Sequence, residues 1–231
     1  MQKLVVISGS GISQESGIPT YRDMGGLWEK YSFEELASPM GWINNPELVL
    51  NFYNARRKQL LECKPNPGHI FLKKLEEFFK ISIITQNIDD LHERAGSSNV
   101  LHLHGEIRKA RSTINQNYIV NIDGAYLNIG DKCPQGSQLR PHVVWFGEEV
   151  TEIPNAIKIV ETAEILVVIG TSLNVYPAAS LIYYANKAKH KFLIDPGSVA
   201  NTTIEGFEII REKAGKGVEI LYNKLVQIGR A

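Results

Sequence analysis

Short apolar runs recur along the chain and predict the strands of a sheet. The first run, Leu4–Ile7, contains no alternating polar residues, a pattern typical of strands buried on both faces of a parallel sheet. Similar runs follow near the middle and in the last third of the sequence. The predicted strands are residues 4–7, 81–85, 165–169 and 191–194.

Stretches with apolar residues at helical spacing lie between these strands. Asn45-Pro46-Glu47 predicts a helix start, because Asn caps helices well and Pro is favoured at the first helical position. A shorter helical stretch around residues 33–37 is expected to end at Pro39-Met40-Gly41. The alternation of helices with apolar strands indicates the α/β class. The longer predicted helices are residues 46–61, a helix that opens at Pro67, and residues 157–162, 178–187 and 218–225.

The composition fits one packed domain, or a domain with a small insert. The chain has 231 residues, of which 43% are hydrophobic. Lys and Arg together number 25, as do Asp and Glu, so no net charge favours nucleic acid or an acidic membrane as a partner. No apolar stretch approaches the roughly 18 residues that span a bilayer, and no signal peptide is visible. Cys63 and Cys133 cannot form a disulfide framework, so we expect a cytoplasmic location.

The loop after the first strand is rich in glycine. Gly9 and Gly11 allow a tight turn and a close approach of another group to the backbone. Ser13 is a candidate N-cap for a short helix whose positive end would attract a phosphate. However, Gln14 stands at the third glycine of the dinucleotide fingerprint, and no acidic residue closes the next strand, which runs into Gln86-Asn87. A standard dehydrogenase is therefore disfavoured.

A longer string around this loop is more specific. The sequence GSGIS-x-x-SGIPTYRD at residues 9–23 resembles the sirtuin signature, which usually has Ala at position 10 and Phe at position 21. The chain is similar to sirtuins over nearly its whole length. Further blocks that agree in order are TQNIDDLHERAG at 85–96, LHGE at 103–106, VVWFGE at 143–148 and GTSLNVYPAA at 170–179.

This resemblance implies a Rossmann-type parallel sheet with a small domain, and a cleft between them that holds NAD and an acylated lysine in a protein or peptide. NAD would be consumed, with release of nicotinamide and transfer of the acyl group to ADP-ribose. We expect the Rossmann part at residues 1–20, 67–104 and 142–231, and the small domain at 21–66 and 105–141. The NAD-binding residues that the resemblance implies are Gly9, Ser10, Gly11, Ser13, Tyr21, Arg22, Gln86, Asn87, Asp89, Gly170, Thr171, Ser172, Asp195 and Ala214.

The histidine pair His102 and His104 offers a candidate base. A lone histidine is more often structural than catalytic, but the sirtuin pattern singles out the one that precedes Gly105. His104 is therefore expected to act as general base toward a ribose hydroxyl, a task suited to a side chain that titrates near neutrality. Asn87 and Asp89 would orient the nicotinamide and the ribose, and with His104 they complete the expected catalytic set.

The substrate side of the predicted cleft involves two segments. Tyr53 and Arg56 lie three residues apart on one helix face, where a hydroxyl beside a guanidinium suits a carboxylate. A solvated basic surface is the simpler interpretation, but in sirtuins resembling the succinyl- and malonyl-lysine deacylases this motif lies in the acyl pocket. The segment that would pair with the substrate backbone contributes Val144, Phe146, Gly147 and Glu148.

Residues 106–141 depart most from the family. Most sirtuins carry two Cys-x-x-Cys pairs here that hold a structural zinc, but Ser112 and Asn115 replace the first pair and Gly136 replaces one member of the second. Cys133 alone cannot provide the four ligands of structural zinc, so no metal is expected.

A different stabilising element is predicted in this region. Residues 118–122 and 125–129 are apolar runs on either side of Asp123-Gly124, which is a strong hairpin signal. We therefore expect a metal-free β-ribbon module.

Two other functions remain open from the sequence. An ADP-ribosyltransferase or NAD hydrolase could use the same cleft, although neither needs His104. A non-catalytic NAD-binding sensor is the second alternative, because the zinc cysteines are missing. The oligomeric state and the protein substrates are not indicated by any motif.

Overall fold

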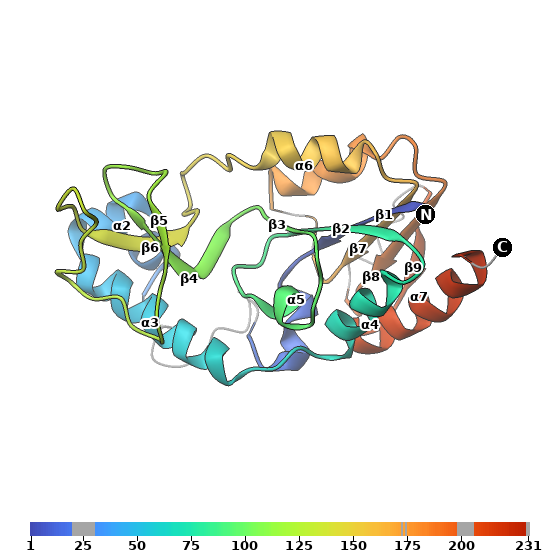
Figure 1. The fold of residues 1–231 in the computed structure, drawn as a ribbon, viewed down its shortest axis with the longest axis horizontal. Helices are drawn as coiled ribbons and strands as arrows, with labels where there is room; N and C mark the ends of the chain where they lie inside the picture. Colours follow the sequence, from blue (N-terminus) through green and yellow to red (C-terminus); the bar gives the residue numbers. More distant parts are fainter. Residues whose placement is uncertain (20–30, 172, 174, 198–205, 230–231) are drawn as a thin grey trace.

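The computed structural model describes residues 1–19, 31–171, 173, 175–197 and 206–229. Its larger part is a six-stranded parallel sheet in the order β3-β2-β1-β7-β8-β9 (Figure 1). This confirms the predicted α/β class with a Rossmann-type sheet. The strands are β1 (Lys3–Ser8), β2 (Lys80–Thr85), β3 (Val100–His102), β7 (Ile165–Ile169), β8 (His190–Ile194) and β9 (Glu208–Ile210).

Helices cover both faces of this sheet, which explains the unbroken apolar runs. Residues Leu4 and Val6 of β1 pack with α4 (Pro67–Leu75) and α7 (Ala214–Gly229) on one face. The neighbouring residues Val5 and Ile7 pack on the other face, with α6 (Ile153–Val160) and the 3₁₀ helix η3 (Ala178–Tyr184). Because successive side chains of a strand point to opposite faces, a strand covered twice must be apolar throughout.

The smaller part of the molecule is a three-stranded antiparallel sheet packed beside helices. Its order is β5-β4-β6, formed by β4 (Gly105–Ser112), β5 (Ile119–Asn121) and β6 (Leu139–Val143). Helices α1 (Phe33–Leu36), α2 (Pro39–Asn44) and α3 (Pro46–Glu62) lie on the same side of the molecule (Figure 1). The remaining short elements are η1 (Ser10–Ile12), η2 (Gln14–Ser16) and α5 (Leu91–Arg94).

One local prediction in the small part is wrong. The hairpin around Asp123-Gly124 does not form, because β5 pairs with β4, and residues 125–129 form no strand. The backbone there is used differently: the side chain of Asn54 exchanges two hydrogen bonds with the backbone of Leu127. The predicted end of the helical stretch near Pro39 is confirmed, because α1 ends at Leu36. Pro39 then begins α2, where its missing N–H costs nothing and Ser38 caps the turn.

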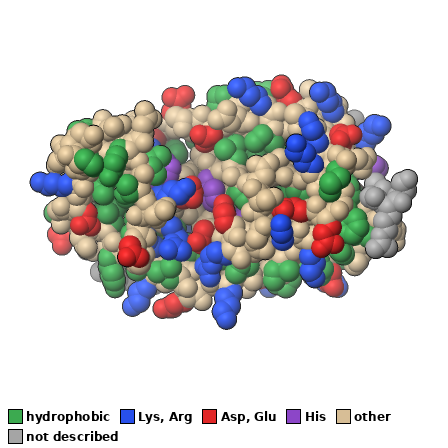
Figure 2. Space-filling model, in the orientation of Figure 1, with side chains coloured by type: hydrophobic (Ala, Val, Ile, Leu, Met, Phe, Trp, Pro, Cys, Tyr) green, Lys and Arg blue, Asp and Glu red, His purple; other side chains and the backbone are tan. Residues whose placement is uncertain are grey.

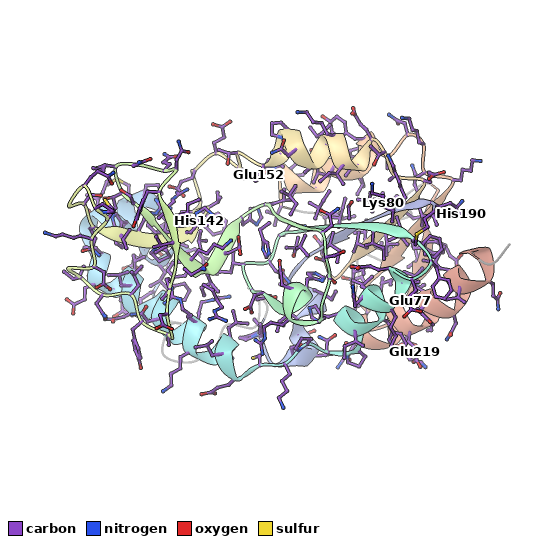
Figure 3. All side chains as sticks on the ribbon, in the orientation of Figure 1. Glu77, Lys80, His142, Glu152, His190 and Glu219 are labelled. Carbon is purple, nitrogen blue, oxygen red and sulfur yellow. The ribbon has the colours of Figure 1, made fainter. Side chains whose placement is uncertain are left out.

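The carboxyl ends of the parallel strands face the small part. Lys80 and His190 begin β2 and β8 and lie at the opposite end of the molecule from His142 of β6 (Figure 3). Lys and Arg side chains are interspersed with Asp and Glu over the face shown in Figure 2, in keeping with the equal numbers of the two charges. Among the helices of the described residues, none combines the length and apolar character needed to cross a bilayer.

Candidate active site at the carboxyl ends of the strands

A cavity of about 650 Å³ lies between the two parts of the molecule. Its wall includes the loops that follow β1, β2, β7 and β8, together with α3 and the segment after β6. The structure brings most of the sequence-predicted residues to this one cavity. Those that line it are Gly9, Ser10, Gly11, Ser13, Tyr53, Arg56, Gln86, Asn87, Asp89, His104, Val144, Phe146, Gly147, Glu148, Gly170, Thr171, Asp195 and Ala214. Tyr21, Arg22 and Ser172 lie outside the described residues.

The loops after β1 and β7 meet at the point where the strand order reverses. Ligands of open α/β sheets bind at such a switch point. Gly11 N–H donates to the Gly170 carbonyl at 2.8 Å, and Gly9 N–H donates to the Ile169 carbonyl at 3.0 Å. Gly170 has φ +59°, and a Cβ there would lie 2.5 Å from the backbone nitrogen of Ile12. The two loops can therefore approach this closely only with glycine at the contact.

Ser13 stands at the N-cap position of the short helix η2, as predicted, but its side chain does not cap that helix. Its backbone is already in the αR region and its side chain makes no capping bond. The buried hydroxyl instead donates to Asp89 Oδ2 at 2.9 Å and accepts from Asn87 Nδ2 at 3.0 Å. Burial raises the pKa of Asp89, and the bonds from Ser13 and from the Leu91 N–H offset this in part. Ser13 thus joins the two polar side chains expected to orient a nicotinamide ribose.

The structure separates the two histidines chemically. His104 lies in the cavity wall, with Nδ1 bonded to the Gln86 carbonyl at 2.9 Å. A carbonyl only accepts, so Nδ1 carries the proton in the neutral ring and Nε2 is the basic nitrogen. Burial lowers the pKa of His104, and the bond to Gln86 opposes this shift without cancelling it. His104 is therefore a neutral base at pH 7.

His102 has two acceptors as partners instead. Nδ1 bonds the Asn87 carbonyl at 3.0 Å and Nε2 bonds Glu93 Oε1 at 2.8 Å. Both bonds require a proton on each nitrogen, so the ring is an imidazolium when they form. Burial would lower the pKa of His102, but the hydrogen bond and charge of Glu93 raise it overall. His102 thus holds the backbone of Asn87 and is a poor candidate for the base.

Tyr53 and Arg56 line the cavity from helix α3. Tyr53 is 2% exposed, and its hydroxyl accepts a hydrogen bond of 3.1 Å from Trp145 Nε1. The Arg56 guanidinium carbon lies 5.5 Å from the centre of the Phe52 ring. A hydroxyl and a guanidinium one helical turn apart therefore border the same cavity as His104.

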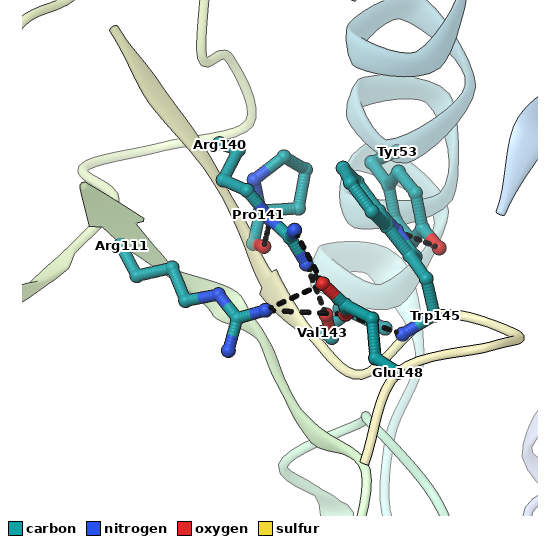
Figure 4. Close-up of polar contacts among 7 residues, drawn as sticks. All are labelled: Tyr53, Arg111, Arg140, Pro141, Val143, Trp145 and Glu148. Atoms are coloured by element: carbon teal, nitrogen blue, oxygen red, sulfur yellow. Dashed lines mark hydrogen bonds and ion pairs between the residues drawn. The ribbon is translucent and has the colours of Figure 1, made fainter. Parts of the chain in front are cut away.

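The segment after β6 is anchored at both ends of its turn. Val144 N–H donates to the His104 carbonyl at 2.9 Å, and Phe146 N–H donates to the Ala37 carbonyl at 3.0 Å. The Glu148 carboxylate accepts from Arg111, Arg140 and the Trp145 backbone N–H, as shown in Figure 4. Glu148 therefore supports this segment from inside, and its direct contact with substrate stays a prediction.

Hydrogen bonds also hold the loops that follow β2, β7 and β8 at the edge of the cavity. Gln86 Nε2 donates to Thr171 Oγ1 at 3.2 Å, which joins the loops after β2 and β7. Asp195 Oδ1 accepts from Gly197 N–H at 2.7 Å. Lys213 borders the cavity beside Ala214, at the start of α7.

The positions that zinc ligands would occupy in most sirtuins do come together in the small part. Ser112 Oγ lies 3.4 Å from Cys133 Sγ and 2.8 Å from Ser137 Oγ, and the Asn115 N–H donates to Ser112 Oγ at 3.1 Å. A hydrogen-bonded cluster of one thiol and two hydroxyls thus fills this place. In the described part of the chain, no group of three or more His, Cys, Asp or Glu side chains is arranged to hold a metal.

Sequence reasoning missed three residues of the cavity wall and its support. Trp145 lines the cavity, and Arg140 and Arg111 bond Glu148 behind it; none is a sequence-predicted candidate, although Trp145 lies within the VVWFGE block. An aromatic residue between two candidate contact residues could have been noticed. Arg140 and Arg111 are separated by 29 positions in the chain, and no local pattern predicts that both bond Glu148.

Comparison with known proteins agrees with this geometry. Residues 9–177 match the Sir2 family. An NAD-dependent protein deacylase from Bacteroides thetaiotaomicron is 52% identical over 231 residues, covering 98% of this chain and 99% of the relative. A solved complex of a Sir2 homologue with NAD has a TM-score of 0.88 and 39% identity, covering 98% of this chain and 90% of that one. A mutant Sir2 homologue complex with 2'-O-acetyl ADP ribose has a TM-score of 0.87 and 38% identity, covering 99% and 94%.

Proposed function

We propose a substrate preference from the premise that this chain belongs to the Sir2 family. It is an NAD-dependent protein deacylase, and its substrates are acylated proteins or peptides. Our proposal is that it removes succinyl or malonyl groups from lysine in preference to acetyl groups. The observation that carries this proposal is that Tyr53 and Arg56, three residues apart on α3, both line the cavity.

The residues of the cavity suit NAD in their chemistry. Two glycine loops meet at the switch point of the sheet, and a buried hydroxyl, amide and carboxylate adjoin them at Ser13, Asn87 and Asp89. When bound, NAD supplies a glycosidic bond whose cleavage releases nicotinamide and provides ADP-ribose as the acyl acceptor. We assign the pyrophosphate to the Gly9–Gly11 loop and the nicotinamide ribose to Asn87 and Asp89.

His104 is the residue to which we assign proton transfer. Its Nε2 takes the proton of a ribose hydroxyl, which makes that oxygen a better nucleophile toward the acyl carbon. Its Nδ1 bond to the Gln86 carbonyl fixes the ring plane and the tautomer while this happens. Asp89 and Asn87, held together by Ser13, keep the ribose in place during the transfer.

The acyl preference follows from charge complementarity. A succinyl or malonyl group ends in a carboxylate, which the Arg56 guanidinium and the Tyr53 hydroxyl can both bond. An acetyl group offers no carboxylate to either side chain. Removing one member of a buried charge pair typically costs about 2–5 kcal/mol, and this is an upper range because Arg56 is only half-buried.

The test compares kcat/KM for succinyl-, malonyl- and acetyl-lysine versions of one peptide. The wild type is expected to favour the two acidic acyl groups, and Arg56→Met should erase that advantage while leaving acetyl turnover intact. Lys58→Met is the matched control, because Lys58 is exposed on the same helix and does not line the cavity. A wild-type preference for acetyl, or an equal loss for all peptides in Arg56→Met, would overturn the acyl assignment.

Other expectations stay predictions. They are the division into a Rossmann part (1–20, 67–104 and 142–231) and a small domain (21–66 and 105–141), a cytoplasmic location, and the lack of nucleic-acid and membrane partners.

A further inference from the structure

Trp145 connects the segment expected to bind the substrate backbone with the acyl pocket (Figure 4). The residue is 2% exposed, and its two nitrogens have different partners. The backbone N–H donates to Glu148 Oε2 at 2.8 Å, and the indole Nε1–H donates to the Tyr53 hydroxyl at 3.1 Å. One side chain therefore touches both the loop and helix α3.

The direction of the indole bond sets the role of the Tyr53 hydroxyl. An indole N–H can only donate, so the Tyr53 oxygen is the acceptor in this bond. Tyr53 then uses its own proton when it bonds another acceptor, and the Trp145 contact fixes where the oxygen sits. A carboxylate is acceptor-only, so this polarity matches an acyl group that ends in a carboxylate.

The indole itself is held rigidly. The Arg140 guanidinium carbon lies 3.4 Å from the centre of the Trp145 ring, and the Trp42 ring lies 5.7 Å away at a tilt of 36°. Arg140 is fixed in turn by a two-point ion pair with Glu148, at 2.7 and 2.8 Å. Stacking on a delocalised cation adds cation–π attraction to the apolar contact.

Glu148 is the common hydrogen-bond partner of Arg140, Arg111 and the Trp145 backbone. It accepts from Arg140, from Arg111 at 3.1 Å, and from the Trp145 backbone. Burial would raise the pKa of Glu148, but the bonds from Arg140 and Trp145 and the charge of both arginines lower it overall. The carboxylate is therefore ionised at neutral pH and the pairing persists.

We infer that Trp145 is a positioning residue for acyl recognition, acting through the Tyr53 hydroxyl. The inference rests on the proposed preference for acyl groups that end in a carboxylate. It assigns part of that preference to a residue that does not itself bond the acyl carboxylate. Arg140 and Glu148 hold the indole and so keep the substrate segment and the acyl pocket in one rigid unit.

The decisive variant is Trp145→Phe, which keeps an aromatic ring for Arg140 and removes only the Nε1–H donor. We expect kcat/KM for the succinyl-lysine peptide to fall about tenfold, with the loss in KM, because one hydrogen bond that orients a charged contact is removed. The acetyl-lysine peptide and the KM for NAD should change by less than about twofold. Trp42→Phe separates packing from hydrogen bonding, since it alters the ring packed on Trp145 and leaves the indole donor to Tyr53 in place.

A double-mutant cycle tests whether Trp145 acts through Tyr53. Tyr53→Phe should lower succinyl activity, and Trp145→Phe added to it should cause no further loss, because the shared bond is already gone. Independent, multiplying losses would overturn the inference. So would a Trp145→Phe enzyme whose ratio of succinyl to acetyl activity equals that of the wild type.

These outcomes differ from a failure of the proposed function. If the wild type shows no preference for succinyl, the acyl assignment fails before Trp145 is tested. A direct measurement remains in that case: the indole N–H resonance of Trp145, identified by its loss in Trp145→Phe, should move upfield in Tyr53→Phe. An unmoved resonance would show that the hydrogen bond is absent in solution and would overturn the inference independently of activity.

Discussion

The two walls of the cavity are held by different kinds of contact. The wall at the strand ends of the large sheet, to which we assign NAD and which we call the cofactor wall, depends on backbone bonds such as Gly11 N–H to the Gly170 carbonyl, and on the neutral hydroxyl of Ser13. The wall to which we assign the acylated lysine, called the substrate wall, depends on arginines: Arg140 and Arg111 both bond Glu148. The first wall is therefore specified by close approach of the chain, and the second by directed charge contacts.

Arg57 shows how far the small part relies on such contacts. Its guanidinium is fully buried and donates to three neutral acceptors, the Ile107 and Ala125 carbonyls and Asn54 Oδ1, at 2.7 to 2.8 Å. Burial, and then the charge of Arg108, lower the pKa of Arg57 to about 10, which still leaves it charged at pH 7. Arg57 thus ties α3 to β4 and to the loop that follows β5.

This difference has a functional consequence. We propose that the cofactor wall serves every acyl substrate, so damage there should affect all substrates equally. We propose that the substrate wall distinguishes acyl groups, so damage there should change their ratio. Substitution of His104, which lines the same cavity, is the test of this division with the largest expected effect.

His104→Ala should lower deacylation by roughly 100-fold or more, since a positioned base contributes about that much. The loss should be the same for acetyl and succinyl peptides, because we assign His104 to a step that all acyl groups share. NAD binding, measured by calorimetry, should survive. His190→Ala is the control, since His190 begins β8 at the far end of the sheet (Figure 3).

The pH profile of the wild type sharpens the same test. Burial lowers the pKa of His104 below its ordinary 6.5, and only the neutral ring can accept a proton. The acid side of the profile should therefore have its midpoint below pH 6.5, with activity falling about tenfold per pH unit below the lowered pKa. If activity already falls on acidification from pH 8 to pH 7, the base is another group. The same conclusion follows if His104→Ala deacylates at a rate close to that of the wild type.

The large sheet was the more predictable of the two regions. Apolar runs such as Leu4–Ile7 and 165–169 have one physical explanation, burial on both faces, and the strands formed where they stand. Strand β9 was not predicted, because Glu208–Ile210 is only three residues long with an exposed glutamate. Short edge strands carry too little apolar pattern to be recognised.

The small part could be predicted less well, because its structure depends on side-chain contacts between residues that are far apart in the chain. Asp123-Gly124 favours a tight turn locally, but the backbone of residues 125 and 127 forms hydrogen bonds with Asn54 and Arg57 of α3 instead of pairing as a strand. These partners are about 70 positions away in the chain, beyond the reach of any local pattern. The candidate site was accessible through motifs, whereas the supporting residues Arg140 and Arg111 were not.

Arg57→Met should destabilise the small part selectively. The change removes a buried charge but leaves the Ile107 and Ala125 carbonyls without their donor, which costs about 1–3 kcal/mol. Hydrogen exchange followed by mass spectrometry should show faster exchange in β4 and residues 122–127, and unchanged protection in β1 and β7. Lys58→Met is again the matched control; a uniform loss of protection across both sheets would contradict the division.

Removal of metal should have the smallest effect of all. A structural zinc site contributes on the order of 10 kcal/mol to folding, so chelation of such a protein lowers Tm strongly. Here Ser112, Cys133 and Ser137 bond one another, and Arg57 and Asn54 fasten the adjoining loop to α3. Tm should therefore be the same with and without a chelator, elemental analysis should find no stoichiometric zinc, and Cys133→Ser should fold and deacylate like the wild type because serine can keep the hydrogen bonds. Stoichiometric zinc, or a Tm that drops on chelation, would show that a metal stabilises the small part. Our account of that part as stabilised by hydrogen bonds and ion pairs alone would then be wrong.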